Sequence, residues 1–252
     1  MLLRRDQPWR AQDEKVLREV IDADCYDLKS LVGRRDLLSF NDNLVVVDIG
    51  AHIGSFARAC ANHWNDMACT GIEYFGFELN AKNWPLLAWN CGLDGESHFE
   101  GRPFHAAVDQ GRTTDQYWFY DSILETGSTA TGASQIRPRG SKPVLVDHAV
   151  RSAPEAQIPV IDMMTVLDCL VRREVSVLKL DCEGAEFRIL AGPSSWLDQV
   201  GVIVGEYHDR ERWDEFVANH SRLAFWDYRE VSRREDKPIG IFHLVNPNWS
   251  GK

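Results

Sequence analysis

Acidic residues and glycines at the ends of apolar runs are the parts of this sequence whose types and spacing could do chemistry. Asp48 closes one such run, and Gly50 and Gly54 follow it in a D-x-G-x-x-x-G pattern. Glycine has no Cβ and readily takes positive φ, so this turn lets backbone approach a ligand closely. The pattern lacks both the G-x-G-x-x-G of a pyrophosphate-binding turn and the Lys-Ser/Thr of a P-loop. It favours a nucleotide without a pyrophosphate, of which S-adenosylmethionine (SAM) is the commonest, although a turn that only packs a helix on a strand is the alternative.

A second acid follows 24 residues after Gly54. The run 69–79 reads as a strand that ends in Glu78, where a carboxylate can accept hydrogen bonds from both hydroxyls of a ribose. A solvated acid at a strand end is the alternative for Glu78. The next predicted strand delivers the small residues Ala106 and Ala107 to its carboxyl end, where they could leave a slot for an adenine ring or simply pack in the core.

A third polar group follows two further apolar runs. The run 175–181 leads into Asp181-Cys182-Glu183-Gly184-Ala185-Glu186, which is too polar for packing alone. The run 200–204 continues into Glu206 and His208, and the two-residue period of a strand puts both side chains on one side of the chain if the extension continues. Open α/β sheets bind ligands at the carboxyl ends of their strands, so we expect both groups to border one site.

The elements that position these residues alternate along the chain. Apolar runs predict strands over 44–47, 69–79, 98–108, 175–181 and 200–204, and a closing antiparallel pair over 225–229 and 240–245. Helical spacing predicts one or two helices within 13–32 and further helices from residue 56, over 80–90, after residue 160, over 187–190 and over 213–218. This alternation predicts an α/β fold around a mostly parallel sheet.

Two segments lie outside this alternation. Residues 1–40 form a predicted N-terminal helical segment, which either covers the sheet edge or cofactor cleft or serves substrate binding or dimerisation. Residues 109–159 form an insertion with a flexible run at 127–134 and short predicted strands at 117–120 and 144–146. A loop of this length is often a lid or a binding loop. Its basic residues, among them Arg137, Arg139 and Lys142, either indicate an acidic or phosphate-bearing substrate or are only solvated.

The composition narrows the classes of function. The chain has 252 residues, 44% of them hydrophobic, and a formal net charge of −10 at pH 7, which one large domain over residues 1–252 explains more simply than two small ones. The negative charge opposes a general nucleic-acid surface, and no apolar run of about 18 residues could span a membrane. Arginines directly after the first leucines leave no signal-peptide core, so we expect a cytoplasmic protein. Six scattered cysteines without a C-x-x-C pattern indicate reduced thiols rather than a zinc site or a disulfide framework.

Three blocks of the sequence resemble the FkbM family of SAM-dependent methyltransferases. They are residues 46–54, 77–80 and 178–186, of which the last is similar to the family's K-[IL]-D-x-E-G-x-E and is the most specific. The resemblance covers residues 14–247. It implies a class I, Rossmann-like methyltransferase fold with a mostly parallel seven-stranded sheet, an antiparallel C-terminal hairpin and helices on both faces. It also implies methyl transfer, typically to a hydroxyl oxygen.

The resemblance implies a site for SAM and its product S-adenosylhomocysteine (SAH). By matching position, Asp48 and the turn would hold the amino-acid end of SAM, and Glu78 its ribose. His52 stands where Asn or Tyr is frequent, and Leu79 where Pro often follows the acid. Family members act on polyketides, sugars and lipids, so the acceptor does not carry over. The residues expected to contact the cofactor are Asp48, Gly50, Ala51, His52, Gly54, Ser55, Glu78, Leu79, Ala107 and Asp181.

Methyl transfer to an alcohol requires in-line positioning and a group that takes the hydroxyl proton. We expect His208 to act as the general base, since an imidazole titrates near pH ~6.5, with Glu206 orienting it or the substrate. A structural hydrogen-bonding role is the alternative for His208. We expect Asp181 to lie against the methionine portion of SAM or the substrate, and Glu183 and Glu186 remain further candidates.

Other readings compete with this one. Asp181, Glu206 and His208 could ligate Mg, Mn or Zn, but no tight ligand spacing is present and we predict no metal. An NAD(P)-dependent oxidoreductase would share the strand, turn and acid but is disfavoured by the missing G-x-G-x-x-G. A non-catalytic interaction module is disfavoured by the intact acids. The sequence thus predicts a SAM-dependent O-methyltransferase whose partner is a small-molecule hydroxyl acceptor of natural-product, sugar or lipid type.

Overall fold

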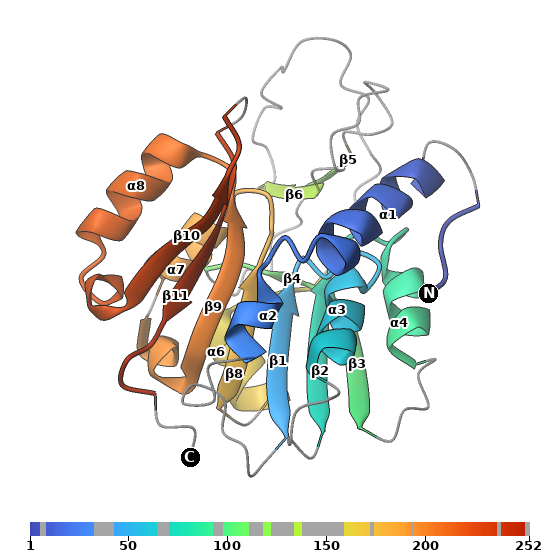
Figure 1. Ribbon diagram of the computed structural model, residues 1–252, viewed down its shortest axis with the longest axis horizontal. Helices are drawn as coiled ribbons and strands as arrows, with labels where there is room; N and C mark the ends of the chain where they lie inside the picture. The colour runs from blue at the N-terminus through green and yellow to red at the C-terminus, as the bar shows by residue number, and fades with distance from the viewer. Residues whose placement is uncertain are drawn as a thin grey trace.

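The structure is a computed structural model that describes residues 1–5, 9–32, 43–64, 71–92, 98–110, 118–121, 134–137, 159–171, 174–192, 194–235 and 238–249. In this part of the chain one seven-stranded sheet has the order β10-β11-β9-β8-β1-β2-β3 (Figure 1). The strands are β1 (Leu44–Ile49), β2 (Ile72–Glu78), β3 (Phe99–His105), β8 (Val175–Leu180), β9 (Val200–Tyr207), β10 (Asp227–Arg233) and β11 (Gly240–Val245).

Most of the sheet is parallel, as the sequence predicted. β1 pairs in parallel with β2 and β8, β2 with β3, and β8 with β9. β11 is antiparallel to both β9 and β10, which confirms the predicted C-terminal hairpin. The chain runs from β1 to β2 and β3 on one side and returns to β8 on the other, so β1 is where the strand order reverses. In open α/β sheets ligands bind outside the carboxyl ends of the strands at such a point.

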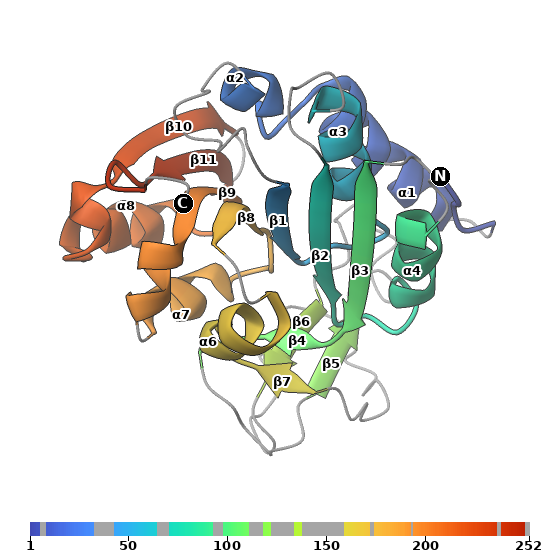
Figure 2. The ribbon, with the colours of Figure 1, turned by 90° about the horizontal axis from the view of Figure 1, so that it is seen from below.

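Helices cover both faces of the sheet (Figure 2). One core cluster joins the sheet to α1 (Trp9–Leu17), the π-helical turn Arg18–Asp22, α2 (Leu28–Val32), α3 (Ser55–Trp64) and α4 (Trp84–Gly92). The other joins it to α6 (Met163–Thr165), the π-helical turn Val166–Val171, α7 (Glu186–Ala191), the 3-10 turns Ser194–Gln199 and Leu223–Phe225, and α8 (Arg210–Asn219). β1 is buried along its whole length because its side chains alternate between these two clusters.

The predicted single strand over 98–108 is two strands in the structure, so the prediction was wrong beyond residue 105. β3 stops at His105, opposite the last residue of β2, and Ala107–Val108 form a separate strand, β4. Beyond His105 the chain has no neighbour left in the sheet. The Ala107 amide instead donates to the Pro159 carbonyl at 2.9 Å, and β4 pairs with β7 (Val160–Ile161). The helix expected from residue 160 therefore begins only after β7, with the Asp162 side chain as its N-cap.

The described parts of the predicted insertion are two strands. β5 (Trp118–Asp121) pairs antiparallel with β6 (Ser134–Arg137), next to the carboxyl-end side of the sheet in Figure 1. β5 confirms the strand predicted at 117–120 within one residue, whereas β6 was not predicted. The strand expected at 144–146, and Arg139 and Lys142, lie outside the described residues.

Two expectations about the whole chain can be compared with its described part. None of the helices described there is long and apolar enough to cross a membrane. Cys25, Cys60, Cys91 and Cys182 have free thiols.

Candidate functional site

A cavity of about 330 Å³ lies at the carboxyl ends of β1, β2 and β8. Its volume is in the usual range for small-molecule sites. The turn after β1, the end of β2, β4 and the loop after β8 form its walls, and Val16, Val20 and Tyr26 of the N-terminal segment complete them. The cavity is therefore at the place that the reversal of strand order predicts.

The predicted site residues divide into two groups. Those that line the cavity are Gly50, Ala51, His52, Ser55, Glu78, Leu79, Ala107, Asp181 and Glu183. Those that do not are Asp48, Gly54, Glu186, Glu206 and His208. The sequence thus located part of the cavity wall, and the residues of the second group are not in its lining.

Position 50 has no room for a side chain. Its φ is +84°, and a Cβ built on it would stand 1.9 Å from the carbonyl oxygen of Asp181. The turn is held against the end of β2, because the amides of Gly50 and Ala51 both donate to the Phe77 carbonyl at 3.0 Å. The loops after β1 and β8 can meet at this distance only where residue 50 is glycine.

Gly50→Ala is therefore expected to destabilise the fold and to reduce SAH binding together. Gly184→Ala is the matched control, since Gly184 also has positive φ (+94°) but has no neighbour within 4 Å of an added Cβ. Urea denaturation measures the free energy of unfolding of both variants. Backbone strain lowers it in both, whereas the steric clash lowers it only in Gly50→Ala. Equal losses of stability in the two variants would contradict the close approach at Gly50.

Glu78 is a fixed acceptor on the cavity wall. Its side chain is buried, its Oε2 accepts from the His52 amide at 2.7 Å, and its Oε1 accepts from the Asn80 amide at 2.7 Å and from Asn83 Nδ2 at 3.4 Å. Burial raises the pKa of Glu78 to about 7, although these three hydrogen bonds oppose the rise. A carboxylate has about four lone-pair sites. The carboxylate therefore keeps acceptor capacity for a ligand.

Asp48 does not line the cavity. Its carboxylate pairs with Lys179 instead. Asp48 is fully buried, accepts from Tyr74 Oη, and lies 2.9 Å from Lys179 Nζ, which also donates to the Gly50 carbonyl at 3.1 Å. Burial lowers the pKa of Lys179, but the carboxylates of Asp48 and Asp181 outweigh it and raise that pKa, so the ammonium stays charged. Lys179 thus connects the Asp48 carboxylate to the backbone of the Gly50 turn.

Sequence analysis gave Lys179 no role of its own. A signal was present, because a single lysine interrupts the apolar strand β8, and a buried ammonium requires an anionic partner. Which carboxylate would be that partner depends on the pairing of β8 with β1, and this is not visible in the sequence.

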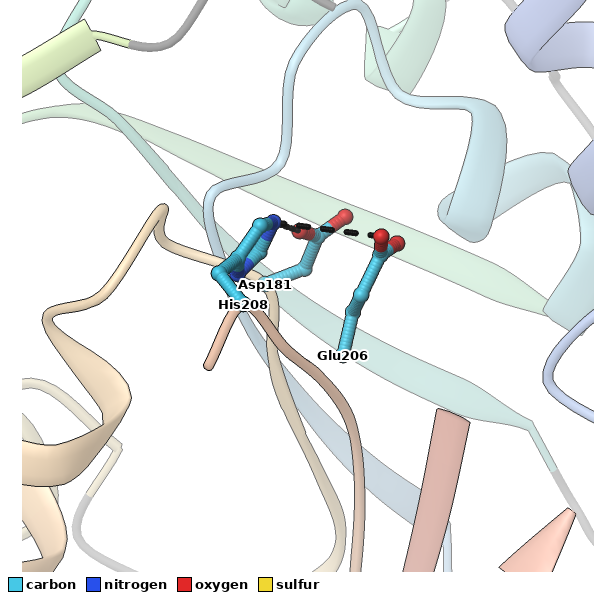
Figure 3. A group of neighbouring side chains, drawn as sticks. All are labelled: Asp181, Glu206 and His208. Atoms are coloured by element: carbon cyan, nitrogen blue, oxygen red, sulfur yellow. Dashed lines mark ion pairs between the residues drawn. The ribbon is translucent and has the colours of Figure 1, made fainter. Parts of the chain in front are cut away.

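Asp181, Glu206 and His208 come together, and their side chains point toward one another in Figure 3. His208 Nε2 is 3.9 Å from Asp181 Oδ1, 3.8 Å from Glu206 Oε1 and 3.4 Å from Glu183 Oε2. This confirms that Glu206 and His208 share one side of the extended chain. The other ring nitrogen, Nδ1, is 3.4 Å from Glu186 Oε1.

The surroundings of His208 do not support the predicted general base. Burial lowers the pKa of His208, but the carboxylates of Glu186, Glu183 and Asp181 outweigh it and raise that pKa to about 10. The ring is then protonated at neutral pH and has no lone pair to accept a proton. His208 also lies outside the cavity lining. The prediction that His208 is the general base assumed a neutral imidazole in contact with the substrate.

The N-terminal segment covers the cavity. Arg4 forms an ion pair with the buried Asp13, donates to Asn83 Oδ1 at 3.0 Å, and lies 3.3 Å from His52 Nε2. Tyr26 Oη donates to Asp181 Oδ2 at 2.8 Å. Of the roles that the sequence left open for this segment, these contacts support that of a cover over the cleft.

Fold and cavity together define the class of the protein. Five parallel strands, a terminal antiparallel hairpin and a cavity at the reversal point of strand order are the features of a Rossmann-like, class I methyltransferase fold. The sequence pattern of the methyltransferase FkbM domain matches residues 48–230. The chain therefore belongs to the FkbM methyltransferase family.

Solved structures that match this chain are distant in sequence. An FkbM methyltransferase from Methylobacillus flagellatus is 12% identical, with a TM-score of 0.48, over 84% of this chain and 46% of that chain. The precorrin-6y C5,15-methyltransferase from Geobacter metallireducens is 12% identical, with a TM-score of 0.40, over 87% and 88%. The magnesium protoporphyrin IX methyltransferase from Synechocystis, with bound SAM, is 8% identical, with a TM-score of 0.44, over 96% and 86%. A search of curated proteins found no match.

Proposed function

We propose that this protein is a SAM-dependent O-methyltransferase that acts on a hydroxyl group of a small molecule, with one catalytic domain over residues 1–252. One observation carries the proposal: the Gly50 turn, the buried Glu78 carboxylate and Asp181 line a single cavity. An adenosine-bearing ligand without a pyrophosphate requires a hydrogen-bond acceptor for its ribose. It also requires a glycine turn that lets the backbone approach closely. The residues present therefore fit SAM.

The cofactor contacts follow from this geometry. Glu78 would accept from the two ribose hydroxyls with the lone pairs that the His52 and Asn80 amides leave free, and one hydroxyl would replace the long 3.4 Å contact from Asn83 Nδ2. The turn from Gly50 would pass close to the amino-acid end of the cofactor, with Asp48 positioning this turn through Lys179 rather than touching the ligand. Ala107, which lines the cavity, would leave room for the adenine.

The chemistry places one demand on the protein. When bound, SAM supplies a methyl group on a sulfonium; transfer to an oxygen breaks the methyl–sulfur bond, leaves its electron pair on sulfur and requires loss of the hydroxyl proton. Asp181 is placed to take that proton, because it lines the cavity and only its Oδ2 accepts from Tyr26. Glu206 and His208 would position Asp181 and the acceptor from the side of β9.

A thermal-shift assay separates this proposal from its two alternatives. SAH should raise the unfolding midpoint, since a ligand at about 100 times its Kd stabilises by about 2.7 kcal/mol, and NADH should leave it unchanged. Protection by NADH alone would favour the oxidoreductase. A protein that binds SAH but transfers no label from methyl-labelled SAM to any of a panel of polyketide, sugar and lipid alcohols would favour the interaction module.

A further inference from the structure

The group around His208 has an arrangement that hydrogen bonding does not explain. One oxygen each from Asp181, Glu183 and Glu206 lies 3.4 to 3.9 Å from His208 Nε2. Hydrogen bonds between nitrogen and oxygen span about 2.7–3.2 Å, so none of these contacts is a normal one. Three carboxylate oxygens therefore lie around Nε2 at the distances of ion pairs, and those of Asp181 and Glu206 also lie close to each other.

These separations match ligands around a shared ion. Two ligand atoms at about 2.1 Å from one ion, a usual distance for divalent metals, are about 3.0 Å apart at a right angle and about 4.2 Å apart on opposite sides. The ligand atoms of Asp181, Glu206 and His208 all lie within 4.8 Å of one another. Small side-chain movements would bring the three atoms onto one ion.

The groups behind the ligands hold them in this orientation. Glu186 is fully buried, and its Oε2 accepts from the Gly184 amide at 2.8 Å, so its Oε1 faces His208 Nδ1 in a fixed position. The Glu186 carboxylate, 3.4 Å from Nδ1, favours a proton on that nitrogen, so Nε2 is the atom left for a ligand role once a bound ion takes the place of its proton. Metal-binding histidines almost always have their other nitrogen held by a carboxylate or carbonyl in this way. Tyr26 holds Oδ2 of Asp181 and leaves Oδ1 toward the same point.

Charge favours a cation at this point as well. The side chains of Asp181, Glu183 and Glu206 are only 28%, 22% and 24% exposed. Lys179 is 3.7 Å from Asp181 and already pairs with Asp48. The imidazolium of His208 supplies one positive charge to these three partly buried carboxylates, whereas a divalent ion that takes the place of its proton would supply two.

We propose that Asp181, Glu206 and His208, with Glu183 beside them, bind one divalent cation. Carboxylates with one imidazole suit Mn²⁺ and related ions better than soft metals. Because Asp181 also lines the cavity, the ion would lie next to the bound acceptor and would polarise its hydroxyl. The proton would pass to an Asp181 lone pair that neither the ion nor Tyr26 uses. This catalytic role depends on the proposed function, whereas metal binding itself does not.

Titration of the full chain with Mn²⁺, followed by the EPR signal of the free ion, tests the site. We expect one Mn²⁺ per chain, with affinity at least tenfold weaker in Glu206→Gln and His208→Gln. Glu211→Gln is the matched control, because Glu211 is an exposed carboxylate on α8 near the same end of β9, and it should bind Mn²⁺ as the unchanged protein does. No binding up to millimolar Mn²⁺, or equal binding by all four proteins, would overturn the proposal.

Two further measurements keep the test decisive. If a variant fails to fold, pulsed EPR of Mn²⁺ on the unchanged protein replaces it: nitrogen modulation from a bound imidazole supports the site, and its absence overturns it. SAH binding is measured in parallel, since Glu206 lies outside the cavity lining. Mn²⁺ binding without SAH binding would refute the proposed function and leave the metal site standing. SAH binding without Mn²⁺ binding would refute the metal site and leave the proposed function standing.

Discussion

Glu78→Gln is expected to weaken SAH binding by about 10²-fold or more. The carboxylate is placed to accept both ribose hydroxyls, and hydrogen bonds to a charged group are worth about 1.5–3 kcal/mol each. The amide has one acceptor oxygen, which the His52 or Asn80 amide would compete for. Each 1.4 kcal/mol lost is a tenfold loss of affinity. Isothermal titration calorimetry with SAH measures the effect directly.

Two controls show whether the loss comes from the ribose contact. Glu100→Gln changes an exposed carboxylate on the neighbouring strand β3 and should leave the affinity unchanged. Burial raises the pKa of Glu78 to about 7, and hydroxyl donors favour its ionised form, so the affinity of the unchanged protein should fall as the pH is lowered from 8 to 6. Glu78→Gln should lack that pH dependence. An affinity within threefold of the unchanged protein would remove Glu78 from the cofactor site.

Lys179→Met is expected to lower the free energy of unfolding by about 3–5 kcal/mol, the usual cost of leaving a buried charge without its partner. Asp48 is fully buried, and its remaining partner among the described residues would be the Tyr74 hydroxyl. The Gly50 carbonyl would lose its hydrogen bond at the same time. Urea denaturation at neutral pH measures the loss.

A double variant tests the cause. Asp48→Asn combined with Lys179→Met should cost less than the sum of the two single changes, because removal of one partner already loses the pair. Lys29→Met, on an exposed lysine of α2, should change stability by no more than about 0.5 kcal/mol. A loss below about 1 kcal/mol in Lys179→Met would show that the pair does not hold the turn in place.

The parts of the site that were predictable are those with a local signal. β1 is a continuous apolar run because it is buried on both faces, the Gly50 turn carries its own residue pattern, and Glu78 closes the next strand. The block from Asp181 to Glu186 was visible as polarity that packing does not need. These signals arise within a few residues of sequence, so strand pairing was not required to read them.

The parts that were missed depend on contacts between distant segments. Lys179 could be assigned to Asp48 only once β8 was placed beside β1. The raised pKa of His208, which follows β9, comes from carboxylates in the block after another strand, β8. The break between β3 and β4 follows from the end of β2, and the cover over the cavity from Arg4 meeting Asp13 and His52.

The account as a whole depends on whether the cavity takes up an adenosine-bearing methyl donor. Calorimetric titration of the purified full chain with SAM and with SAH is the most direct measurement of this. We expect saturable binding of both ligands at one site per chain, strongly weakened in Glu78→Gln and retained in Glu100→Gln. Absence of binding heat for both ligands, at several temperatures and with a protein shown to be folded by circular dichroism, would contradict it.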